Sequence, residues 1–171
     1  MPDPSPTTAL VLSGGGSRGS FQEGALRALA QHGIAFDVVA GGSVGALNGV
    51  MVATGQLDRL SAIWDDVSET DIYGPEQPWR FGLRALAWKV GLAKAPMGWR
   101  SSRPLRKLLG EALDGARLQT DFYAGRVDLV SGEYVDEVDS KRLADQVLAS
   151  ASMPVYVPPV KSEGSHFVDG G

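Results

Sequence analysis

Short apolar runs that end in glycine alternate with helical patterns in the first third of the chain. The runs are Ala9–Leu12 and residues 36–40, and each leads into consecutive glycines, which is typical of a buried strand entering a tight turn. Residues 21–32 and 46–54 carry apolar side chains at helical spacing. Strand, glycine turn and helix, repeated twice, predicts parallel strands that are connected and covered by helices.

The rest of the chain continues this mixture of patterns. Further helices are predicted for residues 57–67, 105–113 and 143–152, and further strands for residues 126–131 and 166–168. No internal repeat of supersecondary length and no low-complexity linker divides the chain. We therefore expect one α/β domain over residues 9–171 with a mostly parallel sheet, preceded by a flexible N-terminal segment at residues 1–8.

The amino-acid composition limits the partners and the catalytic groups that this chain can have. The 171 residues have a formal net charge of −4, which gives no footprint for nucleic acid. Cysteine is absent, so disulfides, thiolate metal ligands and a cysteine nucleophile are excluded. The sequence has no recognisable signal peptide and no run of about 20 apolar residues that could span a membrane. These features predict a cytoplasmic protein, with transient contact at a membrane surface left open.

The second glycine turn has the composition of a nucleophile elbow. Gly41, Gly42, Ser43, Val44 and Gly45 form G-x-S-x-G between a predicted strand and a predicted helix. Small flanking residues permit the tight turn that projects a serine hydroxyl outward, and the helix N-terminus can stabilise developing negative charge. Ser43 is therefore the candidate nucleophile. A serine that only caps the helix is the structural alternative.

The first glycine turn supports three interpretations. Its residues are Gly14, Gly15, Gly16, Ser17, Arg18 and Gly19. Their backbone amides could form an oxyanion hole, in which one donor stabilises a transition state by about 2.7–4 kcal/mol. They also fit the G-x-G-x-x-G pattern of a dinucleotide-binding module, with Asp37 near the position of the ribose-binding acid. The third interpretation is a tight turn without a ligand.

A serine nucleophile needs a base, and the candidates are few. Only His32 and His166 could serve in a triad that contains histidine. His32 is expected on the surface at a helix end, and period-two alternation places His166 and Asp169 on opposite faces of a strand. Asp169 ends a predicted strand, and the carboxyl ends of parallel strands meet at one edge of a sheet. Asp169 could therefore act directly on Ser43, although an Asx turn also places aspartate before glycine.

In this order the three segments resemble the pattern of the patatin-like phospholipase family. That pattern is a glycine-rich oxyanion loop, a G-x-S-x-G nucleophile and an Asp-Gly-Gly or Asp-Gly-Ala base, here Asp169 with Gly170 and Gly171. The Leu-Ser-Gly-Gly-Gly approach to the first loop and residues 149–159 before the base are also similar to family segments. The resemblance is strongest at both ends of the chain.

The resemblance implies a three-layer α/β/α hydrolase that needs no metal or cofactor. Ser43 would attack the carbonyl of an acyl ester in a phospholipid or other acyl lipid, and Asp169 would accept its proton. Amides of the first glycine loop would hold the oxyanion. Family domains usually continue beyond Asp-Gly-Gly, which implies a domain that is incomplete at its C-terminus. A catalytically inactive lipid-binding domain is therefore an alternative, beside the dinucleotide-binding module, and the oligomeric state is not predicted.

The middle of the chain adds a candidate lipid contact. Trp79, Trp88 and Trp99, with arginine and lysine between them, suit an interfacial lid at headgroup depth. Ordinary packing of helices explains these tryptophans equally well.

Overall fold

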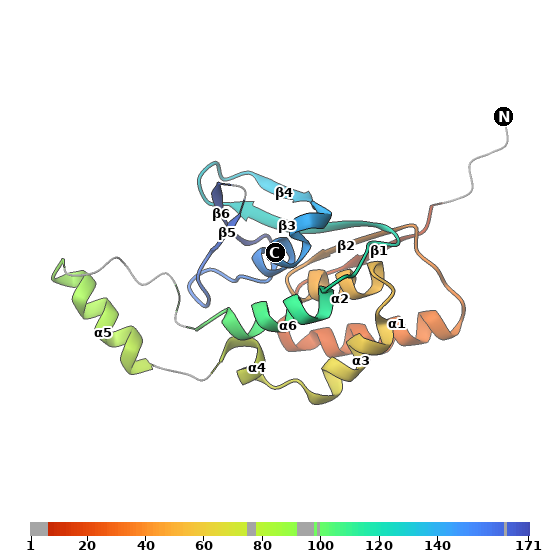
Figure 1. The fold of residues 1–171 in the computed structure, drawn as a ribbon, viewed down its shortest axis with the longest axis horizontal. Helices are drawn as coiled ribbons and strands as arrows, with labels where there is room; N and C mark the ends of the chain where they lie inside the picture. The colour runs from red at the N-terminus through yellow and green to blue at the C-terminus, as the bar shows by residue number, and fades with distance from the viewer. Residues whose placement is uncertain (1–6, 75–77, 92–97, 99, 163) are drawn as a thin grey trace.

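One six-stranded sheet and the helices beside it form the described part of the chain (Figure 1). The computed structural model describes residues 7–74, 78–91, 98, 100–162 and 164–171. The strands are β1 (Ala9–Leu12), β2 (Val38–Gly42), β3 (Asp121–Asp128), β4 (Tyr134–Glu137), β5 (Val160–Ser162) and β6 (Ser165–Asp169). The α-helices are α1 (Gly19–Gln31), α2 (Val44–Ala53), α3 (Leu57–Asp66), α4 (Glu69–Tyr73), α5 (Pro78–Lys89), α6 (Arg103–Leu113) and α7 (Leu143–Ser150). Two short 3-10 helices are η1 (Gly16–Arg18) and η2 (Ser140–Arg142).

The sheet is mixed. Strands β1, β2 and β3 are parallel, as strand–turn–helix repeats require, whereas β4 and β6 pair antiparallel to β3 and β5 pairs antiparallel to β6. Hydrogen-bonded pairing connects the strands in the sequence β1-β2-β3-β6-β5, and β4 is a further partner of β3. This mixed sheet with flanking helices confirms the expected fold class. The direction of β6 differs from the parallel arrangement on which the placement of Asp169 was argued.

The hydrophobic core lies between the sheet and the helices. In α2, a Cβ atom added to Gly49 would lie 3.1 Å from the Val39 side chain and 3.2 Å from the Phe122 ring, so glycine allows this helix to pack closely on β2 and β3. One buried cluster joins these strands to α2, α3, α6 and α7. On the opposite face of the sheet, Val11 and Tyr123 are exposed.

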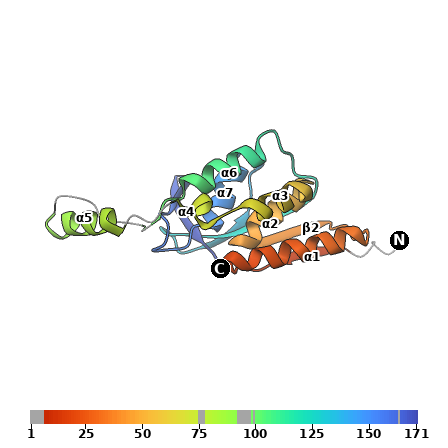
Figure 2. The same cartoon turned by 90° about the horizontal axis from the view of Figure 1, so that it is seen from below.

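Helix α5 differs from the other helices in its surroundings. Figures 1 and 2 show it standing apart from the sheet and from the remaining helices. Within the described residues, no helix is long and apolar enough to cross a membrane. Trp79 and Trp88 belong to α5, but their side chains, like Trp99 as a whole, lie outside the described residues.

Candidate active site

Ser43 occupies a strained turn between β2 and α2. Its backbone has φ 54° and ψ −126°, in the left-handed half of conformational space that non-glycine residues rarely adopt. Such strain costs about 1–3 kcal/mol and is concentrated at functional sites. Ser43 is the N-cap residue of α2, yet its side chain makes no capping hydrogen bond. The structural alternative, a serine that serves only as a helix cap, therefore lacks the contact that would define it.

Two glycines make this turn sterically feasible. A Cβ atom at Gly41 would lie 2.3 Å from the carbonyl oxygen of Gly45, and one at Gly45 would lie 2.2 Å from the carbonyl oxygen of Leu12. Both distances are far below van der Waals contact, so neither position accepts a side chain without movement of the backbone. Gly42, in contrast, has open space where its Cβ would be. The outer glycines of G-x-S-x-G are therefore the ones that this packing requires.

The first glycine loop lies directly beside Ser43. A Cβ atom at Gly14 would lie 3.2 Å from the Ser43 Cβ and 3.8 Å from its Oγ. The loop continues through Gly16 and Ser17, which border the same cavity as Ser43. The structure thus brings together two glycine motifs that α1 separates in the sequence.

Asp37 lies at the other end of β2. It precedes the strand, and its carboxylate accepts a hydrogen bond from the backbone amide of Thr8 at 2.8 Å. In a dinucleotide-binding module the acidic residue would be needed at the end of the sheet where the glycine loop lies. The dinucleotide alternative therefore loses the residue on which its sequence argument depended.

Strand β6, which ends at Asp169, approaches the elbow from the opposite direction to β2. Both β2 and β4 pair with β3 at Tyr123, and both β4 and β6 pair with it at Arg126, so β2 and β6 share one edge of β3. Along that edge Gly42 lies opposite Gly125, and Asp169 lies opposite the next residue, Arg126. The two antiparallel strands thus run toward each other, and their carboxyl ends meet.

The loop that follows Asp169 is closely packed. A Cβ atom at Gly170 would lie 2.8 Å from the backbone nitrogen of Arg126 and 2.9 Å from the Tyr134 ring, which explains glycine at this position. One Asp169 carboxylate oxygen accepts a hydrogen bond from the backbone amide of Gly171 at 2.9 Å. This contact is the Asx turn that the sequence offered as an alternative to a catalytic role. The two roles are compatible, because a carboxylate has a second oxygen.

Neither histidine belongs to the site. His32 caps the far end of α1, where its Nδ1 lies 2.7 Å from the carbonyl oxygen of Ala28. His166 is exposed on β6, opposite Lys161 of β5. Among the described residues that line the cavity beside Ser43 there is no histidine.

An apolar cavity of about 480 Å³ adjoins Ser43. Its wall comes from α2, α3, α4 and α6, and most of the side chains are aliphatic or aromatic: Leu47, Met51, Leu60, Ile63, Trp64, Ile72, Tyr73, Leu105, Leu108 and Leu109. Pockets of this size and character bind apolar small molecules through their walls and orient them through a few polar groups. Here the polar groups include the Ser43 hydroxyl, and the wall suits a hydrocarbon chain.

A polar cluster borders this cavity on the side of α4. The Tyr73 and Tyr156 rings meet edge to face at 5.1 Å, and the Tyr156 hydroxyl donates to a Glu69 carboxylate oxygen at 3.1 Å. Arg100, which is buried, forms an ion pair with Glu69. Burial raises the pKa of Tyr73, and the negative charges of Tyr156, Asp169 and Glu69 raise it further. Glu69, Tyr73 and Tyr156 thus add polar groups to a cavity wall that is otherwise mostly apolar.

No sequence pattern singles out the residues of this polar cluster, whereas Asn48 carries a signal that could have been used. Asn48 is a buried polar residue in the otherwise apolar helix α2. Its side-chain amide donates to the Gly19 carbonyl at 2.9 Å and to Gln22 at 3.0 Å, and it accepts from the Trp64 indole at 2.9 Å. Gln22 in turn donates to the Ser13 carbonyl at 2.7 Å. This network ties both ends of the first glycine loop to the helix that follows Ser43.

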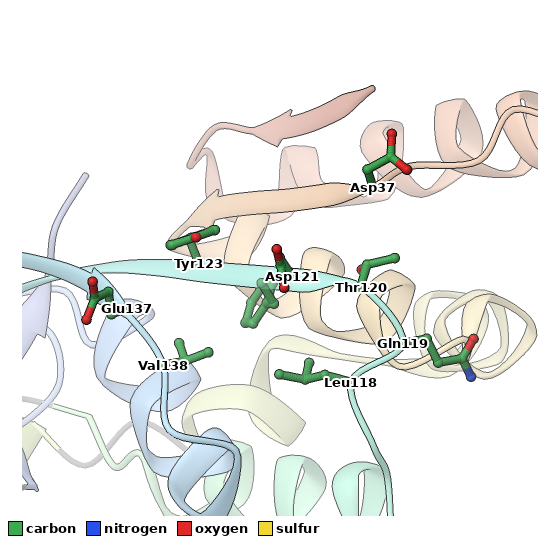
Figure 3. A pocket seen from close by; sticks show the side chains of 9 residues that line it. Asp37, Leu118, Gln119, Thr120, Asp121, Tyr123, Glu137 and Val138 are labelled. Carbon is green, nitrogen blue, oxygen red and sulfur yellow. The ribbon is translucent and has the colours of Figure 1, made fainter. Parts of the chain in front are cut away.

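A second cavity, of about 570 Å³, lies at the amino-terminal end of β2 and β3 (Figure 3). Its wall carries the carboxylates of Asp37, Asp121 and Glu137, and no residue of either glycine motif contributes to its described lining. It is therefore separate from the cavity that Ser43 borders.

Comparison with known proteins identifies the family of this chain. The sequence profile of the patatin-like phospholipase family matches residues 10–171, so the chain belongs to this family, which confirms the resemblance. Lysophospholipase nte1 of Aspergillus terreus is 28% identical over 173 residues, an alignment that covers 96% of this chain and 10% of that protein. Lysophospholipase nte1 of Emericella nidulans is 29% identical over 170 residues, with 95% and 10% covered. The chain thus spans about a tenth of the length of these relatives.

A solved structure agrees with the fold. VipD from Legionella pneumophila superposes with a TM-score of 0.62 at 17% sequence identity, and the match covers 96% of this chain and 46% of that one. At this identity the similarity concerns the architecture alone.

Proposed function

We propose that this chain is a serine lipid acyl hydrolase in which Ser43 is the nucleophile and Asp169 the base. The observation that carries the proposal is the strained backbone of Ser43, held beside Gly14 at the border of an apolar cavity. Strain of this kind persists only where the surrounding structure imposes it, and it is characteristic of nucleophile elbows. The meeting of the carboxyl ends of β2 and β6 supports Asp169 as the partner.

The proposed reaction has two balanced steps. The Ser43 Oγ bonds to the ester carbonyl carbon while its proton passes to the Asp169 carboxylate. Backbone amides of Gly14–Gly19 stabilise the oxyanion, and its collapse breaks the ester C–O bond as Asp169 gives the proton to the departing alcohol. Water then attacks the acyl-enzyme, loses a proton to Asp169 and releases the fatty acid, and the proton returns to Ser43.

The substrate that fits best is a lipid with one acyl chain in the cavity. The relatives are named lysophospholipases, and a lysophospholipid carries a single acyl chain. The apolar wall from α3, α4 and α6 suits the hydrocarbon, while the ester lies beside Ser43.

Labelling with a fluorophosphonate, followed by peptide mapping, tests the nucleophile. We expect the label on Ser43, no labelling of Ser43→Ala, and full labelling of Ser131→Ala, which removes an exposed hydroxyl from the turn between β3 and β4. Turnover of p-nitrophenyl esters should disappear only in Ser43→Ala. A folded wild-type chain that is not labelled would refute the hydrolase and favour an inactive lipid-binding domain.

Helix α5 supports a peripheral contact with a lipid surface. Leu83, Leu86 and Val90 are exposed at helical spacing, and the helix and its end carry Arg80, Arg84 and Lys89 but no acidic residue. The helix lies between α4 and α6 in the chain, and both of these border the cavity. We expect co-sedimentation with phosphatidylserine-containing vesicles that weakens several-fold in Leu83→Ser/Leu86→Ser, whereas Leu129→Ser, at an exposed leucine after β3, leaves it unchanged.

A further inference from the structure

The carboxyl end of α7 contacts the main chain of both proposed catalytic residues. Ser150 ends this helix, and its Oγ accepts a hydrogen bond from the backbone amide of Ser43 at 3.2 Å. Two residues later, the carbonyl oxygen of Ser152 accepts from the backbone amide of Asp169 at 3.0 Å. One short segment is therefore bonded to both residues, although Ser150 lies 107 residues after Ser43 in the sequence.

The Ser150 hydroxyl also bonds to β3, the strand with which both β2 and β6 pair. It donates to the carbonyl oxygen of Gly125 at 2.6 Å. Gly125 lies opposite Gly42, the residue before Ser43, and the next residue, Arg126, lies opposite Asp169. The hydroxyl thus links the amide of the elbow to the point on β3 where β2 and β6 meet.

The hydrogen bond from the Ser43 amide to Ser150 stabilises a backbone conformation that is unfavourable by itself. The φ of Ser43 is unfavourable for any residue with a side chain, so the surrounding contacts must hold it. Ser150 is 0% exposed, so no water competes with its hydroxyl for the Ser43 amide. Without the hydroxyl, the amide and the Gly125 carbonyl would be left without this partner in a dry interior, which favours a shift of the elbow.

We infer that Ser150 is a positioning residue that holds the main chain of Ser43 in register with the end of β6. The inference rests on the proposed function, because it assigns a purpose to the relative position of Ser43 and Asp169. Ser150 does not line the apolar cavity. Its loss should therefore change the chemical step and leave binding of the acyl chain intact.

Ser152 provides a matched control within the same segment. It is also 0% exposed, and its hydroxyl donates to the Leu148 carbonyl at 2.7 Å, within the turn that ends α7. Its bond to Asp169 comes from the backbone carbonyl, which alanine retains. Ser152→Ala thus removes an equally buried hydroxyl without removing either link to the proposed catalytic residues.

The test compares the kinetics of Ser150→Ala and Ser152→Ala with those of the wild type on a p-nitrophenyl ester. In Ser150→Ala we expect kcat to fall about 10–100-fold with KM within about twofold, because small displacements of a nucleophile carry such penalties. In Ser152→Ala kcat should stay within about threefold. An unchanged kcat in Ser150→Ala, or an equal fall in both variants, would overturn the inference.

Amide hydrogen exchange separates this inference from the proposed function. The Ser43 amide should exchange faster in Ser150→Ala than in the wild type, and at the wild-type rate in Ser152→Ala. Unchanged exchange in Ser150→Ala would overturn the inference even in an active enzyme. An inactive wild type with the expected exchange pattern would refute the hydrolase but retain the link. Ser150→Cys, which has a similar size and a weaker hydrogen-bonding group, carries the same test if the alanine variant does not fold.

Discussion

The amino-terminal ends of β2 and β3 border one cavity, and the turn that follows β2 borders another of similar volume but different lining. At the amino-terminal end, about 570 Å³ is lined by strand and loop residues that include Asp37, Asp121 and Glu137. At the carboxyl-terminal end, about 480 Å³ is lined mostly by aliphatic and aromatic side chains and includes Ser43. The first cavity has a polar lining. The second combines an apolar wall with a serine whose backbone is strained.

This comparison shows that the site is identified by several chain segments that converge on it and not by the volume of the cavity. At the carboxyl-terminal end, two glycine turns and the end of β6 meet at one point. Each of these features restricts the backbone, so together they hold reactive groups in fixed positions. None of the described residues that line the polar cavity has a positive φ. The amino-terminal end of the sheet thus carries charged side chains, but its backbone is not restricted in the same way.

The largest expected effect separates the aspartates at the two ends. Asp169→Asn should lower kcat about 10²–10⁴-fold, the usual contribution of a general base. Asparagine keeps an oxygen that can accept from the Gly171 amide, so the Asx turn survives and only the base is lost. Asp37→Asn, at the polar cavity, should leave kcat within about twofold. Steady-state kinetics on a p-nitrophenyl ester measure both values. An active Asp169→Asn variant would show that Asp169 is not the base and only forms the Asx turn.

The second effect concerns the glycines that shape the elbow. Gly45→Ala should lower the free energy of unfolding by about 1–3 kcal/mol or more, because its Cβ would lie 2.2 Å from a backbone oxygen. Gly42→Ala meets open space and should change the stability by no more than about 0.5 kcal/mol. Urea denaturation measures both values. Equal destabilisation in the two variants would show that the close approach is not what requires glycine.

Local patterns were sufficient to predict the parts of the site that lie in turns. Strand, glycine turn and helix fix where Ser43 lies along the chain, because a G-x-S-x-G turn has few other uses in that context. The same patterns placed the third strand at residues 126–131, whereas β3 begins at Asp121 and ends at Asp128. The turn residues were the stronger signal, since their restrictions are local.

Long-range pairing could not be predicted in the same way. The antiparallel direction of β6 depends on the extension of β3 beyond the end of β2, and no periodicity in residues 165–169 encodes that extension. The contacts of Ser150 with Ser43 and of Tyr156 with Tyr73 join segments more than 80 residues apart. Asn48 was accessible in principle, because a polar side chain on a buried apolar helix needs partners.

A smaller effect tests which cavity holds the acyl chain. Leu108→Trp adds bulk to the apolar wall and should lower kcat/KM for a long-chain ester about tenfold, since hydrophobic pockets discriminate by chain size at this scale. A short-chain ester should be affected less than about twofold. Leu118→Trp, in the lining of the polar cavity, should leave both esters unchanged. If Leu118→Trp instead produced the length-selective loss, the acyl chain would belong to the other end of the sheet.

The smallest effect comes from Tyr73 on the wall of the apolar cavity. Its pKa is raised above 10.0, chiefly by burial, so between pH 10 and its folded-state pKa the unfolded chain has released a proton that the folded protein retains. The free energy of unfolding must therefore fall as pH rises through this window, and part of that fall belongs to Tyr73. Tyr73→Phe keeps the ring that meets Tyr156 edge to face and removes the ionising group. Urea denaturation at pH 8 and at several values above 10 should give a shallower alkaline loss of stability in Tyr73→Phe than in the wild type. Titration of the other tyrosines and lysines cancels in this comparison, so parallel curves for the two proteins would mean that the Tyr73 hydroxyl is not shielded by the wall of the cavity.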